Sequence, residues 1–280
     1  MSYQPFRGGR APLDYCPCHY FGSKLIFRGP PRHLDGDYVA FLGGTETYGK
    51  FIREPFPAMV EKRLGLACVN LGWPNAGLDV LLNDPAMSKA RVGAAAVVLQ
   101  MPGAQNMSNR FYTVHRRRND RFLKATAALR RLFPDVDFTE FHFTRHMLRR
   151  LQGVSPDRFD LVREELRTVW VERMDKLLAG DGPPVVALWF AARRPSLGCD
   201  GADLAQDPAF VTRRMLEAVR TKAAQVVEVT ASATALKTGT SGMVFSSVEA
   251  PAANELLGPA AHAEAAVALV PALRDVMAVA

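Results

Sequence analysis

The sequence is poor in the features that mark secreted and membrane proteins. It has only four cysteines in 280 residues, too few and too scattered to predict a disulfide framework in a chain of this size. No apolar run is long enough to span a bilayer, and the first residues include no hydrophobic stretch of a secretory signal. With 48% hydrophobic and 22% charged residues, the composition is that of a globular protein. We therefore expect a cytoplasmic protein without an integral membrane segment.

The cysteines also give little indication of a metal site. Cys16, Cys18 and His19 resemble one half of a metal-binding clip, but no second half with matching spacing follows. A structural zinc site needs four ligands, and Cys68 and Cys199 are isolated. We predict neither a metal nor another cofactor.

Positive charge is unevenly distributed. The net charge is +7, and the densest basic cluster covers 115–121. A second cluster contains Arg145, His146, Arg149 and Arg150. Such clusters bind nucleic acid, acidic lipid or an anionic small molecule, or they form a solvated surface. No RNP, zinc-finger or KH motif accompanies them, so we predict no nucleic-acid partner.

Apolar segments that end in glycine or polar residues alternate with helical patterns from residue 38 onward. Residues 1–36, rich in Gly, Pro, Tyr and Arg, are expected to form an arm packed on the core, and 37–280 a single α/β domain. The expected strands are 38–42, 67–72, 94–101, 184–190 and 225–230.

Helical spacing predicts helices between these strands and a helical insertion over 135–180. Strands that alternate with helices favour a doubly wound, mostly parallel five-stranded sheet in a three-layer sandwich. A flavodoxin-like strand order of 2-1-3-4-5 would put the ends of the first and third strands at the switch point, where open α/β sheets bind ligands. The expected helices are 47–64, 78–89 (interrupted by Pro85), 119–132, 210–223 and 259–280.

A diglycine turn follows the first expected strand. Gly43 and Gly44 precede Thr45, which opens the next helix. A side chain there lies at the carboxyl end of the sheet, where helix N–H groups favour an anion or oxyanion. Thr45 is therefore a candidate reactive residue, and the alternative is a helix N-cap. The third strand ends in a similar Gly-containing polar segment, which supplies Gln105 and Asn106.

Four blocks in this order resemble those of the SGNH (GDSL-like) hydrolase superfamily. The first is Phe-Leu-Gly-Gly-Thr-Glu-Thr-Tyr-Gly over 41–49, against a family consensus close to Phe-Leu-Gly-Asp-Ser-Ile-Thr-Tyr-Gly. The second covers 69–77 with its Asn-x-Gly, the third 103–106, and the fourth 259–262, which ends in histidine. The resemblance implies an SGNH-like fold.

The resemblance also implies roles for individual residues. Thr45 takes the place of the nucleophilic serine, His262 that of the base and Asn106 that of an oxyanion donor. Asn75, Gly77 and Gln105 would complete the oxyanion site. The chain departs from the family where Gly44 replaces the Asp beside the nucleophile and Pro259 replaces the triad Asp. The nearest stand-ins for that acid are Glu249 and Glu255.

Arginines follow the third block directly. Arg110, His115, Arg116 and Arg117 are predicted to reach over the pocket and hold an anionic group of the substrate. The alternative is a solvated loop. Arg145 and His146 are candidates for the same cluster.

The whole chain also resembles an uncharacterised bacterial family, a domain of unknown function common in alphaproteobacteria. Residues 106–115 and 137–143 carry this likeness.

Three functions are consistent with these residues. The first is an SGNH-like esterase or acyl-group transferase that acts on an anionic saccharide, lipid or small molecule. The second is a non-catalytic SGNH-like module that binds an acidic ligand. The third is sulfuryl or phosphoryl transfer, which ranks last because no Gly-x-x-x-x-Gly-Lys-Ser/Thr loop is present.

Overall fold

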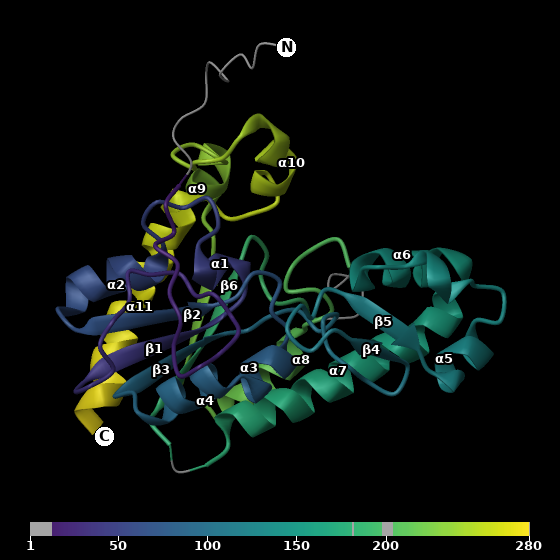
Figure 1. Cartoon of the computed structure of the whole chain (residues 1–280), viewed down its shortest axis with the longest axis horizontal. Coiled ribbons are helices and arrows are strands. Elements are labelled where there is room, and N and C mark those ends of the chain that lie inside the picture. The colour runs from purple at the N-terminus through teal and green to yellow at the C-terminus, as the bar shows by residue number, and fades with distance from the viewer. Residues whose placement is uncertain (1–12, 181, 198–203, 280) are drawn as a thin grey trace.

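Five parallel strands form the central sheet of the protein. A computed structural model describes residues 13–180, 182–197 and 204–279; Cys199 lies outside these ranges. The sheet order is β2-β1-β3-β6-β7, with every neighbouring pair parallel (Figure 1). This confirms the predicted doubly wound fold and its strand order. The strands are β1 (Tyr38–Gly43), β2 (Ala67–Gly72), β3 (Ala96–Gln100), β6 (Val185–Ala191) and β7 (Gln225–Thr230).

Helices cover both faces of this sheet. Along β1, Val39 and Phe41 pack with α2 (Phe56–Leu64) and α11 (Pro259–Val279). The alternate residues of β1 point to the opposite face, where they belong to the buried cluster to which α3, α4, α7 and α8 contribute. Burial on both faces explains why β1 is apolar along its whole length. The covering helices include α3 (Leu78–Asn83), α4 (Pro85–Val92), α7 (Pro156–Leu178) and α8 (Arg213–Arg220).

The predicted helix over 119–132 is wrong in its first half. A small antiparallel hairpin, β4 (Tyr112–Val114) with β5 (Phe122–Ala125), precedes α5 (Ala127–Leu132). In β5 only the two end residues are buried, so its pattern is not the alternation typical of a strand. The hairpin lies beside the helical insertion, away from the central sheet (Figure 1).

The predicted helix over 47–64 is two helices. The first, α1 (Thr45–Tyr48), ends at Gly49, whose φ of 71° is left-handed. The second, α2, begins after Pro55, a residue tolerated at a helix start. Gly49 and Pro55 thus break what the apolar spacing alone predicts as one helix.

The helical insertion is present within 135–180 and packs against the strand ends. It contains η1 (Phe138–Glu140), α6 (Thr144–Val154) and the long α7. Trp170 of α7 is fully buried, and its indole N–H donates to the carbonyl of Pro102 over 2.8 Å. This bond joins the insertion to the segment after β3. The remaining short helices are α9 (Ala233–Thr238), η2 (Ser247–Glu249) and α10 (Ala250–Ala253).

The described part of the N-terminal arm, 13–36, lies against the core. Cys18 and Phe27 form an isolated antiparallel bridge, and Phe27 is completely buried. The first twelve residues of the predicted arm lie outside the described residues. Among the helices that the structure describes, none is long and apolar enough to cross a membrane.

Candidate functional site

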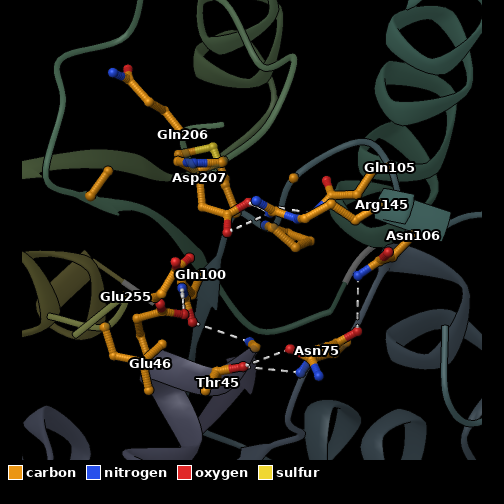
Figure 2. Close-up of a pocket in the computed structure, with 18 of the residues that line it drawn as sticks. Thr45, Glu46, Asn75, Gln100, Gln105, Asn106, Arg145, Gln206, Asp207 and Glu255 are labelled. Atoms are coloured by element: carbon orange, nitrogen blue, oxygen red, sulfur yellow. Dashed lines mark hydrogen bonds and ion pairs between the residues drawn. The ribbon is translucent and has the colours of Figure 1, made fainter. Parts of the chain in front are cut away.

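A pocket of about 630 Å³ opens at the carboxyl ends of β1, β3 and β6. This is the predicted switch point of the sheet. Figure 2 shows Thr45 and Asn75 on one side of it, and Arg145 and Asp207 across from them. Among the residues that the structure describes, the lining comes from eight segments: 44–46, 75–76, 100–106 without Ala104, 120, 143–145, 190–193, 205–208 and 255–257.

The diglycine turn is held by one buried side chain, Gln100. Its Oε1 accepts the N–H groups of Gly44 and Thr47, each over 3.1 Å, and the Thr47 hydroxyl. A Cβ on Gly43 would overlap the Thr47 hydroxyl and Gln100. Gly43 therefore allows the close approach that orients Thr45.

Thr45 faces the pocket and contacts Asn75. The Asn75 N–H donates to Thr45 Oγ1 over 3.0 Å, and the Thr45 hydroxyl lies 3.4 Å from Asn75 Oδ1, which accepts from it. The N-cap of α1 is Gly44, so Thr45 is inside the helix. The alternative that Thr45 serves only as an N-cap is therefore wrong.

Asn75 and Asn106 meet beside Thr45. Asn106 Nδ2 donates to the carbonyl of Asn75 over 3.2 Å, and Asn106 Oδ1 accepts from the Thr144 hydroxyl over 2.7 Å. A Cβ on Gly77 would overlap the Asn106 carbonyl. The predicted residues Thr45, Asn75, Gly77 and Asn106 therefore do come together in space.

Gln105 takes part in a different contact. Its Nε2 lies 3.4 Å from Asp207 Oδ1, which accepts its hydrogen bond. Asp207 in turn receives two hydrogen bonds from Arg145 Nη2, over 2.7 and 2.8 Å. This group forms the wall opposite Thr45 (Figure 2). His146, predicted beside Arg145, packs instead on the ring of Phe141.

Glu46 is a titratable residue of the pocket that the sequence motif did not single out. Its half-buried carboxyl accepts a hydrogen bond from Gln100 Nε2 over 3.2 Å. Loss of solvent, and then the charge of Asp207, raise the pKa of Glu46. Burial also raises the pKa of Asp120, whose Oδ2 accepts from Asn75 Nδ2 over 3.4 Å.

His262 lies in the core instead of lining the pocket. It is 1% exposed, and its Nδ1 accepts the backbone N–H of Phe56 over 3.2 Å. Its ring packs on those of Phe56 and Phe190. Burial, and next the charge of Arg28, lower the pKa of His262 to about 3. The hydrogen bonds of the described residues join Thr45 to Asn75 and His262 to Phe56, and the predicted Thr45–His262 hydrogen bond is not among them.

Glu249 and Glu255, the two candidates to replace the missing triad acid, are not among the described contacts of His262. Glu255 lines the pocket. Glu249 accepts hydrogen bonds from the backbone N–H and hydroxyl of Ser246, which lower the pKa of Glu249.

The basic residues predicted to hold an anionic group lie outside the pocket beside Thr45. Arg110 forms an ion pair with Glu165 over 3.1 Å. His115, Arg116 and Arg117 line a second cavity and not the pocket beside Thr45. The hairpin β4–β5 explains the difference, because it directs this segment away from the strand ends.

Sequence reasoning missed Glu46, Gln100, Asp120 and Asp207. Glu46 directly follows Thr45, and Gln100 is the polar end of an otherwise apolar strand. Both signals are present in the sequence. Asp207 comes from an irregular segment that no pattern connects with the pocket.

Several solved structures are similar in arrangement. A carbohydrate esterase family 2 enzyme with a carbohydrate-binding domain, from Corynascus thermopiles (Myceliophthora fergusii), has a TM-score of 0.43 and 13% identity, over 90% of this chain and 73% of that chain. An extracellular lipase from Streptomyces rimosus has a TM-score of 0.42 and 12% identity, over 86% of this chain and 100% of that chain.

Comparison of the sequence with known proteins identifies the family of this chain. No curated protein matches the chain. Among the residues that the structure describes, no group of three or more His, Cys, Asp or Glu is arranged to hold a metal. A family model does match, over residues 1–277. The chain therefore belongs to the family described as domain of unknown function (DUF6473).

Proposed function

We propose that the protein is an enzyme that hydrolyses an ester or transfers its acyl group, with Glu46 as the proton-transferring residue. The observation that carries this proposal is the position of the Glu46 carboxyl in a concave pocket at a strand-end switch point, where burial raises its pKa. A carboxyl with a raised pKa is a better proton acceptor near neutral pH than an ordinary one. The SGNH-like first block over 41–49 supports the choice of ester chemistry.

The chemistry starts with a water molecule beside Glu46. The Glu46 carboxylate accepts a proton from the water, and at the same time the oxygen of the water attacks the ester carbonyl carbon. The resulting tetrahedral intermediate breaks its bond to the alkoxide, which takes the proton back from Glu46. Thr45 and Asn106 lie close enough together, through Asn75, to orient the carbonyl. In the acyl-transfer variant, an acceptor hydroxyl takes the place of water.

The charges in the pocket favour an uncharged substrate with hydroxyl groups, such as an acylated saccharide. Both arginines of the lining are engaged, Arg145 with Asp207 and Arg193 with the carbonyls of Pro208 and Val211. The predicted anionic substrate and the sulfuryl or phosphoryl transfer therefore lose their support in this pocket. Four carboxylic acids also line it: Glu46, Asp120, Asp207 and Glu255.

The first experiment compares turnover of an uncharged short-chain aryl ester and an acetylated sugar by wild type and Glu46→Gln. We expect Glu46→Gln to lower kcat/KM by about 100-fold or more, because general acid–base catalysis contributes about that much. Glu172→Gln, on the exposed surface of α7, is the matched control and should retain wild-type rates. Wild-type turnover by Glu46→Gln would contradict the proposal.

A pH profile sharpens this test. Burial, and next the charge of Asp207, raise the pKa of Glu46. Asp207→Asn should therefore move the acidic limb of the kcat/KM profile to lower pH. A mass increase on Thr45 during turnover, with activity lost in Thr45→Val, would assign the nucleophile to Thr45 instead of water.

The second candidate is a non-catalytic binding module. The Thr45–Asn75 pair and the buried His262 favour it, because they leave the hydroxyl without the expected histidine base. This candidate predicts saturable binding of an acylated sugar, no turnover, and equal affinity in wild type and Glu46→Gln.

A further inference from the structure

The buried side chain of Asn119 fixes the loop that contains His115, Arg116 and Arg117. This side chain is completely buried. Its Nδ2 donates to the carbonyls of His115 and Arg116 over 3.1 and 3.4 Å. Its Oδ1 accepts the N–H groups of Gly77 and Val80 over 3.1 and 3.0 Å. The loop is thereby attached to the start of α3.

Two further side chains restrain the same loop. Trp73 Nε1 donates to the carbonyl of Arg117 over 2.7 Å. His115 Nδ1 accepts the N–H groups of Arg117 and Arg118 over 3.3 and 3.1 Å. Arg116 and Arg117 are exposed, yet they project from a backbone that hydrogen bonds hold in one conformation.

Lys24 of the N-terminal arm comes from a second restrained loop. Its neighbour Ser23 is buried, donates to Asp84 Oδ2 over 2.6 Å and accepts the N–H of Leu25 over 3.0 Å. Asp84 Oδ1 caps α4 by accepting the N–H of Ala86 over 2.9 Å. Both oxygens of Asp84, the one carboxylate in the described lining between the loops, therefore already accept hydrogen bonds.

A cavity of about 340 Å³ lies between the two loops. Its walls are 22–24 and 115–117, with 80 and 83–85 between them, and it shares no lining residue with the pocket beside Thr45. Lys24, Arg116 and Arg117 face it. None of the three takes part in an ion pair with the residues that the structure describes.

We propose that this cavity is a second site, which binds the phosphate or sulfate group of a small molecule. Two guanidinium groups and an ammonium group offer charge-assisted hydrogen bonds to a tetrahedral oxyanion, and Arg binds such groups in bidentate fashion. The fixed backbone lowers the entropy lost on binding. Among the described residues of the lining, none is Phe, Tyr or Trp, so the stacking partners that single-stranded nucleic acid requires are missing. This proposal is independent of the ester chemistry.

The test uses the full chain and titrates inorganic phosphate, sulfate and pyrophosphate by calorimetry, at constant ionic strength set with chloride. We expect saturable binding with one site. Arg116→Gln combined with Arg117→Gln should weaken it by about ten-fold or more, since hydrogen bonds to charged groups are strong. Lys24→Gln should weaken the binding as well, because it removes the positive charge from the opposite wall of the cavity. The ranking of the three anions distinguishes phosphate from sulfate as the preferred group.

The matched control is Arg149→Gln combined with Arg150→Gln, which removes the same charge from an exposed part of α6. It should change the affinity by less than about two-fold, as expected for screened distant charges. Equal weakening by both pairs would mean non-specific attraction and would overturn the proposal. So would the absence of saturable binding for all three anions, or an unchanged affinity in Lys24→Gln.

Discussion

The imidazole of His262 stacks on the ring of Phe56, with 5.7 Å between the centroids, and accepts the backbone N–H of the same residue. This N–H is the first donor of α2, which has no side-chain cap. A helix end that is buried needs such a partner. His262 thus joins α11 to α2 as a structural residue, and only an unprotonated Nδ1 can accept this bond.

The first prediction concerns stability in acid. The pKa of His262 is lowered from 6.5 to about 3 in the folded protein. Between these values the unfolded chain binds a proton that the folded protein does not, so stability falls as the pH decreases through this window. The slope reaches at most about 1.4 kcal/mol per pH unit.

Urea unfolding of wild type and His262→Gln at several pH values measures this effect. The glutamine retains an acceptor but does not titrate. Its free energy of unfolding should decline less steeply than that of wild type in acid, since only the carboxylates common to both then contribute. Parallel curves would show that His262 does not carry the depressed pKa.

The second prediction concerns Glu46, whose pKa shift has the opposite direction from the usual carboxylate case. Its pKa is raised in the folded protein. Folded protein therefore holds the proton more tightly, and stability is lost as pH rises from the ordinary value of 4.5 to the raised one. Glu46→Gln should accordingly stabilise the protein at neutral pH, by the roughly 0.5–2 kcal/mol typical of single stabilising substitutions, while it lowers activity.

Urea unfolding at neutral pH and near pH 4 tests the sign. The gain should shrink in acid, where Glu46 is protonated in both states. Glu172→Gln is again the control and should change stability little at either pH. A loss of stability in Glu46→Gln at neutral pH would mean that the ionised carboxylate is favoured by the fold.

Four strands of the sheet, β1, β2, β3 and β6, could be predicted because they are mostly apolar segments buried on both faces. The fifth, β7, has an exposed residue and was found from its Val residues at 226, 227 and 229. The same logic brought Thr45, Asn75 and Asn106 together, since residues after neighbouring parallel strands lie at one edge of a sheet. The hairpin strand β5 could not be found this way. Its residues at 123 and 124 are exposed, so burial follows neither a period of two nor a continuous run.

The parts of the site that the sequence does not predict depend on tertiary packing. Arg145 and Asp207 form a hydrogen bond although 62 positions separate them in the sequence. Arg145 lies at the start of a helix and Asp207 in an irregular segment, so no local pattern predicts this contact. His262 matches the fourth block in sequence, but a block match does not determine whether a ring on α11 faces the pocket or the core. Glu46 was within reach of sequence reasoning, because a carboxyl next to Thr45 shares its strand end.

The third prediction tests how the N-terminal arm is fixed. The buried Arg28 guanidinium donates to the carbonyls of Tyr48 over 3.1 Å, Ile52 over 2.8 Å and Arg53 over 2.9 Å, and also to that of Gly49. A lysine has a compact charge that cannot reproduce this planar arrangement. Arg28→Lys should cost about 2–4 kcal/mol, because it leaves buried groups unpaired.

Thermal melting of Arg28→Lys, with the exposed Arg131→Lys as control, measures the difference. The control should melt within about 1–2 °C of wild type, since surface substitutions change stability little. Equal melting temperatures for both variants would mean that the arm does not depend on the guanidinium.

The fourth prediction contrasts two glycines. A Cβ on Gly77 would overlap the backbone carbonyl of Asn106, which cannot move without displacing the pocket wall. A Cβ on Gly153, inside α6, meets nothing within 4 Å. Gly77→Ala should therefore destabilise the protein by about 3 kcal/mol or more and abolish ester turnover. Gly153→Ala should stabilise it by roughly 0.5–1 kcal/mol, because alanine favours the helix, and should leave turnover unchanged. Urea unfolding and the ester assay on both variants check this contrast, and a Gly77→Ala protein of wild-type stability would contradict the close approach of Gly77 to Asn106.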